Sequence, residues 1–400
     1  MIQAAVLGYG TVGSGVVQVI DENRDKITGH TGDEIHVKYI LDLREFPGDV
    51  NEKKVVHDYN TIVNDPEVSI ICETMGGVNP AYQFTKDALL KGKSVCTSNK
   101  ELVAAHAPEL LQLAKENHCS YLFEASVGGG IPIIRPLNTS LAPENIEKIK
   151  GILNGTTNYI LSKMASEDVS FETVLKEAQE KGYAEKNPKA DVEGIDACRK
   201  IAILASLMTG KNVDSAAIHT EGITDITTED FQYAKKMGKS IKLLAMCTQS
   251  ADGIGAMVAP FMIGAGHPLN GVNGVFNAVY VTGNMLGDVM FYGQGAGKLA
   301  TASAVVSDVM ECAQTLGSTV AFSWSKEAAV LQDYQEAKYS FFVRVPVLER
   351  GSVMNSFEII KEISIKDDEF GFITKPMTEK ELQDRKKGIR QIIHVIRIEE

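Results

Sequence analysis

The strongest constraint on the fold is a glycine loop close to the N-terminus. Residues 8–13 read G-Y-G-T-V-G and separate an apolar stretch, Ile2–Leu7, from a helical stretch, Thr11–Asn23. Between a strand and a helix, this Gly-x-Gly-x-x-Gly spacing permits a tight turn, close approach of a pyrophosphate and close packing of the helix. The N–H groups at the helix start suit phosphate oxygens. We therefore predict that a dinucleotide cofactor binds Gly8, Gly10, Thr11, Val12 and Gly13.

The rest of the first third continues this strand–helix alternation. Strands with little polar alternation, separated by helices, indicate a parallel sheet that is covered on both faces. Right-handed crossovers then give an α/β, Rossmann-type doubly wound domain. The further strands are expected at Ile35–Asp42, Ser69–Thr74, Ser94–Thr97 and Cys119–Phe123, and the further helices at Pro80–Lys91 and Glu101–Glu116.

The pattern changes near Pro136. We expect mainly helices as far as Gly210, then strands at Gly255–Phe261 and Val275–Thr282, and a glycine-rich break at Tyr292–Gly297. The last segment, residues 339–400, reads strand, helix, strand, strand, helix, strand, which is a small β-α-β-β-α-β unit. Its elements are expected at Tyr339–Val347, Met354–Ile360, Ile363–Lys366, Phe370–Thr374, Thr378–Lys387 and Ile392–Ile398.

These patterns predict three domains. Residues 1–135 form the dinucleotide-binding domain, on which a helix at 301–316 packs back. Residues 136–300 form an α+β substrate and dimerisation domain, and residues 323–338 form a linker to the small domain at 339–400.

Composition excludes several classes of protein. The net charge of -12 argues against nucleic acid and anionic membrane surfaces as partners, because both attract clustered Lys and Arg. No apolar run approaches the roughly 18 residues that span a bilayer, and no signal peptide precedes the first strand. The six cysteines are scattered, which indicates buried free thiols in a reducing cytoplasm.

Two charged residues lie at the end of the second predicted strand, which is where such a domain contacts the cofactor ribose. An acid such as Asp42 accepts a hydrogen bond from the 2′-OH of NAD, whereas an arginine such as Arg44 pairs with the 2′-phosphate of NADP. Either residue can instead be a solvated loop charge. The pair slightly favours NADP and leaves NAD possible. Ends of later strands add Thr74, Ser98 and Lys100 to the expected cofactor site.

Two lysines have unusual surroundings. Lys100 begins a helix directly after a strand end, although helix N-termini disfavour cations. The helix Gly194–Met208 is apolar on nearly every face and should be buried, yet Asp196 and Lys200 lie four residues apart on it. Such charges form a structural ion pair or mark a site. A lysine beside another cation, or partly desolvated, has a lowered pKa, so Lys100 and Lys200 facing one another across a cleft would suit proton exchange.

At this point the chain resembles the homoserine dehydrogenases. The resemblance covers the chain from its start to about Leu316, and the segments 151–159 and 191–200 are close to diagnostic. It rests on Gly8–Gly13, Thr97–Lys100, Phe123–Pro132, Gly151–Tyr159, Gly182–Glu185, Asp191–Lys200 and Tyr292–Gly297.

The resemblance implies reversible NAD(P)-dependent oxidation of L-homoserine to L-aspartate 4-semialdehyde, which serves threonine and methionine synthesis. It implies that Lys200 is the proton donor or acceptor and that Lys100 assists. Glu185 and Asp196 match substrate ligands, and Gly182 and Gly297 match backbone contacts near the cofactor or the substrate. We add Asp191, Gly155 and Thr156 to the substrate site, although a capped helix start explains the last two equally well.

The same resemblance implies a monovalent cation, expected to be sodium. The Glu124 side chain and the backbone carbonyls of Val127, Gly129 and Ile131 match its ligands. The residues alone would also fit an ordinary turn.

The C-terminal unit is similar to an ACT domain, a regulatory unit that binds amino acids. Its first loop reads Glu349-Arg350-Gly351-Ser352 and has no proline where such domains often have Asp-x-Pro-Gly. Binding of threonine and a purely oligomeric role both stay open, and we expect a homodimer or a homotetramer. Asn187 also departs from the family, which often has aspartate there.

Two other functions compete with this interpretation. A different two-domain Rossmann oxidoreductase, such as an aspartate-semialdehyde dehydrogenase, would need a nucleophilic cysteine with a histidine partner. A non-enzymatic amino-acid sensor would have no use for lysines in a cleft.

Overall fold

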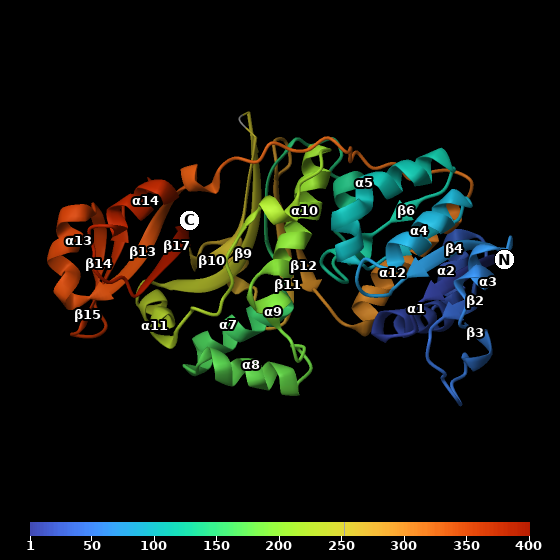
Figure 1. Ribbon diagram of the computed structural model, residues 1–400, viewed down its shortest axis with the longest axis horizontal. Helices are drawn as coiled ribbons and strands as arrows, with labels where there is room; N and C mark the ends of the chain where they lie inside the picture. Colours follow the sequence, from blue (N-terminus) through green and yellow to red (C-terminus); the bar gives the residue numbers. More distant parts are fainter. Residues whose placement is uncertain (252) are drawn as a thin grey trace. The chain divides into compact units, whose positions relative to one another are not determined.

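The computed structural model describes residues 1–251 and 253–400 (Figure 1). The chain divides into two compact units, which we describe separately. The first unit contains Met1–Asn145, Ala202–Ser215 and Phe291–Ala329, and the second contains Ile146–Ile201, Ala216–Met290 and Val330–Glu400. The division at 135, 300 and 338 that the sequence predicts stays a prediction.

The first unit is built on a six-stranded sheet in the order β3-β2-β1-β4-β5-β6. Every pairing in it is parallel, which confirms the Rossmann-type doubly wound fold. The strands are apolar because helices cover both faces, and the carboxyl ends of β1, β4 and β5 meet at one edge. Their bounds are β1 Ile2–Leu7, β2 Ile35–Leu41, β3 Val55–Val56, β4 Val68–Glu73, β5 Ser94–Thr97 and β6 Tyr121–Leu122.

A helix from late in the chain completes this unit. Helix α12 (Lys298–Gln314) packs against α1 (Thr11–Glu22), and a Cβ added to Gly15 would lie 2.9 Å from the Cβ of Ala302. Val16, Val17 and Ile20 share one core cluster with the inner face of α12. The helix begins at Lys298, three residues before the predicted start. The other helices are α2 Arg24–Thr31, α3 Tyr59–Val63, α4 Ala81–Leu90, α5 Lys100–Glu116 and α6 Ile134–Asn138.

The second unit carries a mixed sheet in the order β12-β11-β7-β9-β10-β17-β13-β15-β14. The short strands β8 (His219–Thr220) and β16 (Met377–Thr378) pair with β10 and β13. The strands before the C-terminal segment are β7 Ile146–Ile152, β9 Lys239–Ser250, β10 Gly253–Gly264, β11 Phe276–Gly283 and β12 Gly287–Gln294.

The helices of the second unit are α7 Gly155–Glu167, α8 Phe171–Glu180, α9 Lys189–Val192, α10 Ile195–Thr209 and α11 Thr228–Lys236. The last residues of α10 belong to the first unit. Among the described residues, no helix is both long enough and apolar enough to cross a bilayer.

Three strands of this sheet correct the sequence prediction. Strand β7 lies in a region that we predicted to be mainly helical, because its apolar residues recur every third position, as in a helix. Antiparallel pairing with β9 and β11 makes it a strand instead. Strand β9 was not predicted at all. Tyr292–Gln294, predicted as a glycine-rich break, is the end of β12.

Apart from the two-residue strand β16, the C-terminal segment has the predicted β-α-β-β-α-β order, and its strands are neighbours in the order β17-β13-β15-β14. It does not form a separate sheet, because β17 pairs in parallel with β10. The predicted helix Met354–Ile360 and strand Ile363–Lys366 are wrong. The β-branched pair Ile359 and Ile360 begins a strand on β15, and the helix lies earlier. The elements are β13 Lys338–Pro346, α13 Arg350–Ser356, β14 Ile359–Ile363, β15 Glu369–Thr374, α14 Glu379–Lys386 and β17 His394–Glu399.

Candidate active site

The glycine loop has the geometry that its spacing predicts. Gly8 has a φ of +90°, and a Cβ on Gly13 would lie 1.9 Å from the carbonyl oxygen of Gly8. Only glycine fits at these positions. A Cβ on Gly10 would meet no protein atom within 4 Å. The space beside Gly10, at the N-terminus of α1, is where a pyrophosphate would approach.

Thr74 supports this loop from the end of β4. Its hydroxyl donates to the carbonyl oxygens of Leu7 and Gly8, at 2.9 Å each. The structure therefore brings Thr74 to the loop, together with Thr11 and Val12 in the first turn of α1.

Asp42 and Arg44 form one tight pair after β2. The Asp42 carboxylate accepts from the Tyr9 N–H at 2.8 Å, from the Arg44 N–H at 3.0 Å, and from Nε and Nη2 of Arg44 at 2.9 and 2.8 Å. These bonds, chiefly the one from the Arg44 side chain, hold the pKa of Asp42 well below its usual range. They occupy all of the about four acceptor positions of a carboxylate. The Arg44 side chain is 63% exposed and leaves donors for another anion.

A buried carboxyl group joins the ends of β4 and β5. Glu73 accepts from the Thr97 hydroxyl at 2.5 Å and from the Met75 N–H at 2.8 Å, and its carbonyl accepts from the Ser98 N–H at 3.3 Å. Thr97 in turn accepts from the N–H of Asn99 at 2.9 Å, and Asn99 caps α5. The loop that carries Ser98 and Lys100 is thus fixed to the cofactor edge. Sequence reasoning missed Glu73, although a lone carboxylate ending the apolar run of β4 was a signal.

In the second unit, Lys200, Asp196, Asn154 and Asp191 form one group of polar residues. The Lys200 Nζ lies 2.7 Å from Oδ2 of Asp196 and donates to the carbonyl oxygen of Leu153 at 2.7 Å. The Nδ2 of Asn154 donates to Oδ2 of Asp196 at 2.8 Å and to Oδ1 of Asp191 at 2.7 Å. Asp196 and Lys200 are only 3% and 8% exposed. The predicted helix face therefore carries an ion pair, and it belongs to a larger polar group.

Asn154 also caps α7. Its side chain accepts from the N–H of Thr157 at 2.8 Å, so the capped helix start is real. A Cβ on Gly155 would lie 2.8 Å from the carbonyl oxygen of Val275, which explains this glycine by packing. The Thr156 hydroxyl donates to the carbonyl oxygen of Tyr183 at 2.6 Å and ties the helix start to the segment 182–185.

Other predicted residues are not brought into these groups. Glu185 is exposed, and its side chain makes no hydrogen bond or ion pair with any residue that the structure describes. Gly182 has a φ of +74° and lies in the second unit, whereas the other predicted cofactor residues lie in the first. Lys100 and Lys200 belong to different units. Their predicted approach across a cleft stays a prediction.

The predicted cation loop lies in the first unit. Glu124 is buried, and its carboxylate accepts from the N–H groups of Ile133, Ile134 and Arg135 at 2.6, 2.9 and 2.7 Å. Gly128 and Gly129 have φ of +76° and +57°. Within the described residues, no cluster of three or more His, Cys, Asp or Glu side chains is arranged for a metal ion. The predicted set contains only one such side chain.

Cavity size does not locate this site. A cavity of about 580 Å³ lies in the second unit, beside Lys150, Tyr334, Tyr339 and Glu399. It has no predicted site residue in its lining.

The cysteines also match their prediction, since all six are buried and free. Burial raises the pKa of Cys119 and of Cys247 to about 12. A thiol with a raised pKa is a poor nucleophile at neutral pH, which argues against the aspartate-semialdehyde dehydrogenase reaction.

Comparisons with known proteins agree with this arrangement. Residues 8–124 match the family model "Homoserine dehydrogenase, NAD binding domain", and residues 132–310 match "Homoserine dehydrogenase". The homoserine dehydrogenase of Bacillus subtilis is 44% identical over 312 residues, 77% of this chain and 72% of that protein. The chain belongs to the homoserine dehydrogenase family. It is therefore an NAD(P)-dependent oxidoreductase that acts on a CH–OH group.

Other homoserine dehydrogenases extend the match to the C-terminal segment. The enzyme of Mycobacterium tuberculosis (strain ATCC 25618 / H37Rv) is 36% identical over 400 residues, 97% of this chain and 87% of that protein. The crystal structure from Thiobacillus denitrificans is 31% identical with a TM-score of 0.93, and it covers 100% of this chain and 98% of that chain. An archaeal homoserine dehydrogenase in complex with NADPH is 28% identical with a TM-score of 0.65, over 78% of this chain and 97% of that chain.

Proposed function

We propose that Lys200 is the group that exchanges a proton with the substrate oxygen in the interconversion of L-homoserine and L-aspartate 4-semialdehyde. The observation that carries this proposal is the buried group of Lys200, Asp196, Asn154 and Asp191. A buried ammonium group that donates a hydrogen bond to a carboxylate is held in one orientation, so its other N–H bonds also have fixed directions.

In the reducing direction, the Lys200 ammonium group donates a proton to the aldehyde oxygen. In the oxidising direction, neutral Lys200 takes the proton of the substrate hydroxyl. NAD(P) supplies or accepts the hydride when it is bound. Asp196 accepts from Lys200 in the ammonium state and stabilises it, and we propose that Lys100 assists.

We propose that carboxylates hold the substrate ammonium group. Asp191 and Asp196 lie together through Asn154. Glu185 joins them in this proposal, from an exposed segment that the Thr156 bond to Tyr183 connects to α7. Gly155 and Thr156 then line the substrate end of the site.

Replacement of Lys200 tests the central assignment. The Lys200→Ala variant should lose roughly a hundredfold or more in turnover, which is the scale of general acid–base catalysis. Its dissociation constant for the cofactor should change less than about twofold, because the glycine loop lies elsewhere in the chain. A matched control is Lys189→Ala on the neighbouring exposed segment, where turnover should be unchanged. An active Lys200→Ala enzyme would remove Lys200 from the mechanism.

We propose NADP as the preferred cofactor, with NAD possible. The Asp42 carboxylate is occupied by Arg44 and Tyr9, so it has no vacant position for a ribose 2′-OH, whereas Arg44 is exposed. A guanidinium group in this place suits a 2′-phosphate. The archaeal relative described above was solved with NADPH.

We propose that a monovalent cation, sodium, binds Glu124 and the carbonyl oxygens of Val127, Gly129 and Ile131. The residues fit such an ion. Three N–H groups occupy about three of the four acceptor positions of the Glu124 carboxylate. The other three residues are buried, and within the described part of the chain their carbonyl oxygens accept no hydrogen bond. A bound cation would supply the positive charge that these buried oxygens lack.

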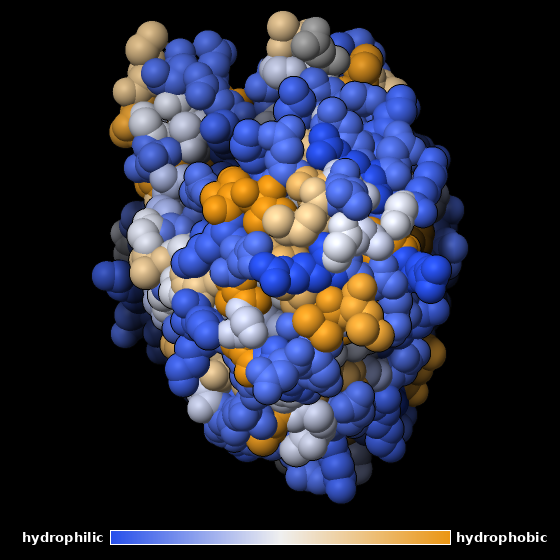
Figure 2. Space-filling model, turned by 90° about the vertical axis from the view of Figure 1, so that its left-hand side faces the viewer, coloured by the Kyte–Doolittle hydropathy of each residue, from blue (hydrophilic) through white to orange (hydrophobic). Residues whose placement is uncertain are grey.

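We propose a homodimer or homotetramer in the cytoplasm, with the C-terminal segment as an ACT-like unit that binds threonine or serves assembly. Figure 2 views the side that carries α13, β14 and β15, and hydrophobic patches interrupt its hydrophilic surface. Apolar patches of this kind mark interaction sites. Exposed apolar residues of the segment are Val347, Leu348, Met354, Ile360 and Ile393.

A further inference from the structure

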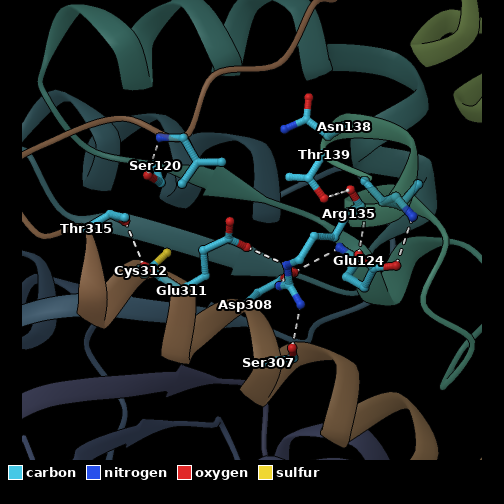
Figure 3. Close-up of polar contacts among 12 residues, drawn as sticks. Ser120, Glu124, Arg135, Asn138, Thr139, Ser307, Asp308, Glu311, Cys312 and Thr315 are labelled. Carbon is cyan, nitrogen blue, oxygen red and sulfur yellow. Dashed lines mark hydrogen bonds and ion pairs between the residues drawn. The ribbon is translucent and has the colours of Figure 1, made fainter. Parts of the chain in front are cut away.

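One polar cluster of the first unit is not used by the mechanism above. It centres on Arg135, whose guanidinium group points at α12 (Figure 3). Its Nε donates to Oε2 of Glu311 at 2.6 Å, Nη1 donates to the Ser307 hydroxyl at 2.6 Å, and Nη2 donates to Oδ1 of Asp308 at 2.8 Å. Three donors of one planar group are therefore matched to three acceptors of one helix.

Asp308 and Arg135 both form hydrogen bonds with Glu124. The second carboxylate oxygen of Asp308 accepts from the backbone N–H of Glu124 at 2.9 Å. The backbone N–H of Arg135 donates to the Glu124 side chain at 2.7 Å. Glu124, Asp308 and Arg135 thus form a closed ring of hydrogen bonds, which we name the α12 ring.

The α12 ring fixes Glu124 more fully than packing alone would. Asp308 holds its backbone, and α6 holds its carboxylate. Glu124 and Asp308 are 3% and 2% exposed, so each would be costly to bury without these partners. Charge-assisted bonds from a bidentate or tridentate guanidinium group are also specific in direction, which a lysine would not reproduce.

The loop that follows Glu124 lies directly on the start of α12. A Cβ on Gly129 would lie 2.5 Å from the carbonyl oxygen of Gly295, and one on Gly130 would lie 3.0 Å from the Cβ of Ala300. The N–H of Gly130 also donates to the carbonyl oxygen of Gln294 at 3.2 Å. The loop 127–131 is therefore packed directly against the start of α12.

We infer that Asp308 and Arg135 are positioning residues for the cation loop: the α12 ring sets the positions of the Glu124 carboxylate and of the carbonyl oxygens of Val127, Gly129 and Ile131. This inference rests on the cation site proposed above. Ligands around a metal depend on the residues that orient them, and loss of such a partner typically weakens binding by about 10- to 100-fold.

The test measures cation binding without catalysis. The melting temperature of the enzyme is followed as sodium chloride replaces choline chloride at constant ionic strength. For Asp308→Asn we expect the sodium concentration at half of the stabilisation to rise by about tenfold or more. Ser307→Ala is the matched control, because it removes a partner of Arg135 that has no bond to Glu124. Its midpoint should stay within about twofold of that of the unaltered enzyme.

A second variant and a kinetic measurement complete the design. Arg135→Lys keeps the charge and loses the planar fork, so its midpoint should lie between those of the unaltered enzyme and Asp308→Asn. For both variants the sodium concentration for half-maximal activity should rise, while kcat at saturating sodium stays within about threefold of the unaltered value.

The outcomes are separable. If the unaltered enzyme shows no specific response to sodium, the cation site itself is wrong and the inference falls with it. If the unaltered enzyme responds and Asp308→Asn only melts earlier, with the same sodium midpoint, Asp308 has a general structural role and the positioning inference alone is wrong.

Discussion

At the scale of single residues, Glu73 has the most consequential environment. It is completely buried at the cofactor edge of the sheet. Burial is the largest cause of its shift and raises its pKa to about 7, although the Thr97 hydroxyl, the Met75 N–H and the Asn99 side chain act in the opposite direction. The group that orders the Lys100 loop therefore titrates close to neutral pH.

This shift has a defined effect on stability. Between about pH 4.5 and pH 7 the unfolded chain loses the Glu73 proton while the folded enzyme keeps it, so this residue lowers the free energy of unfolding as pH rises. The total contribution is at most roughly 3 kcal/mol. Glu73→Gln, which cannot ionise, should remove this slope. Urea denaturation at pH 5, 6, 7 and 8 measures it, and parallel curves for the two proteins would contradict the shift.

Residue contacts differ in how far the sequence foretells them. Asp196 and Lys200 are four residues apart on one helix, so their ion pair could be predicted from helix geometry. Arg135 and Asp308 are far apart in the chain. Their contact depends on where α12 packs, and no local pattern contains that information. The same limit hid the role of Glu73, whose partner Thr97 comes from the next strand.

At the scale of elements, two glycines in the turn between β1 and α1 should respond differently to replacement by alanine. Gly13→Ala should separate the helix from the strand, because the new Cβ would lie 1.9 Å from the Gly8 carbonyl oxygen. Overpacking of this kind costs about 1–3 kcal/mol. We therefore expect a lower urea midpoint. We also expect cofactor affinity to fall by at least about tenfold, because about 1.4 kcal/mol corresponds to a factor of ten in the dissociation constant.

Gly10→Ala is the matched comparison. Its Cβ would meet no protein atom within 4 Å, so the urea midpoint should stay nearly unchanged. The methyl group would occupy the approach of the pyrophosphate, and cofactor titration should show a loss similar to that of Gly13→Ala. Normal cofactor binding by Gly10→Ala would place the pyrophosphate elsewhere.

Elements built from local pattern were the easiest to predict. The main strands and helices of the first unit follow from apolar runs, caps and glycines, and the predicted bounds of β1, β5 and α5 agree within one residue. The shorter elements β3, α2, α3 and α6 were not predicted. The sheet of the second unit was harder. The apolar residues of β7 recur every third position, as in a helix. Pairing with β9 and β11, which come later in the chain, makes it a strand.

At the scale of the whole molecule, the C-terminal segment completes a sheet rather than standing apart. Strand β17 covers the edge of β10 through pairs such as Phe261 with Arg397, and Arg397 forms a two-pronged ion pair with Glu221. The segment is therefore part of the sheet of the second unit.

Deletion of residues 338–400 tests how far the second unit depends on this segment. Phe261 is fully buried and contacts the ring of Tyr339, so the deletion should expose it together with the β10 edge. We expect a loss of at least roughly 3 kcal/mol in unfolding free energy, the scale of one aromatic core residue, and aggregation in gel filtration. A monodisperse, active protein with an unchanged urea midpoint would show that the segment is an independent addition.

The placement of α12 has a consequence for how the enzyme is made. The apolar face of α1, with Val16, Val17 and Ile20, is closed by a helix that starts at Lys298. A ribosome that adds about 5–20 residues per second needs on the order of ten seconds to pass from the end of the first sheet to this helix. During that interval the nascent nucleotide-binding fold presents an uncovered hydrophobic stripe. Chaperone capture of stalled chains should therefore be strongest for those that end before residue 298.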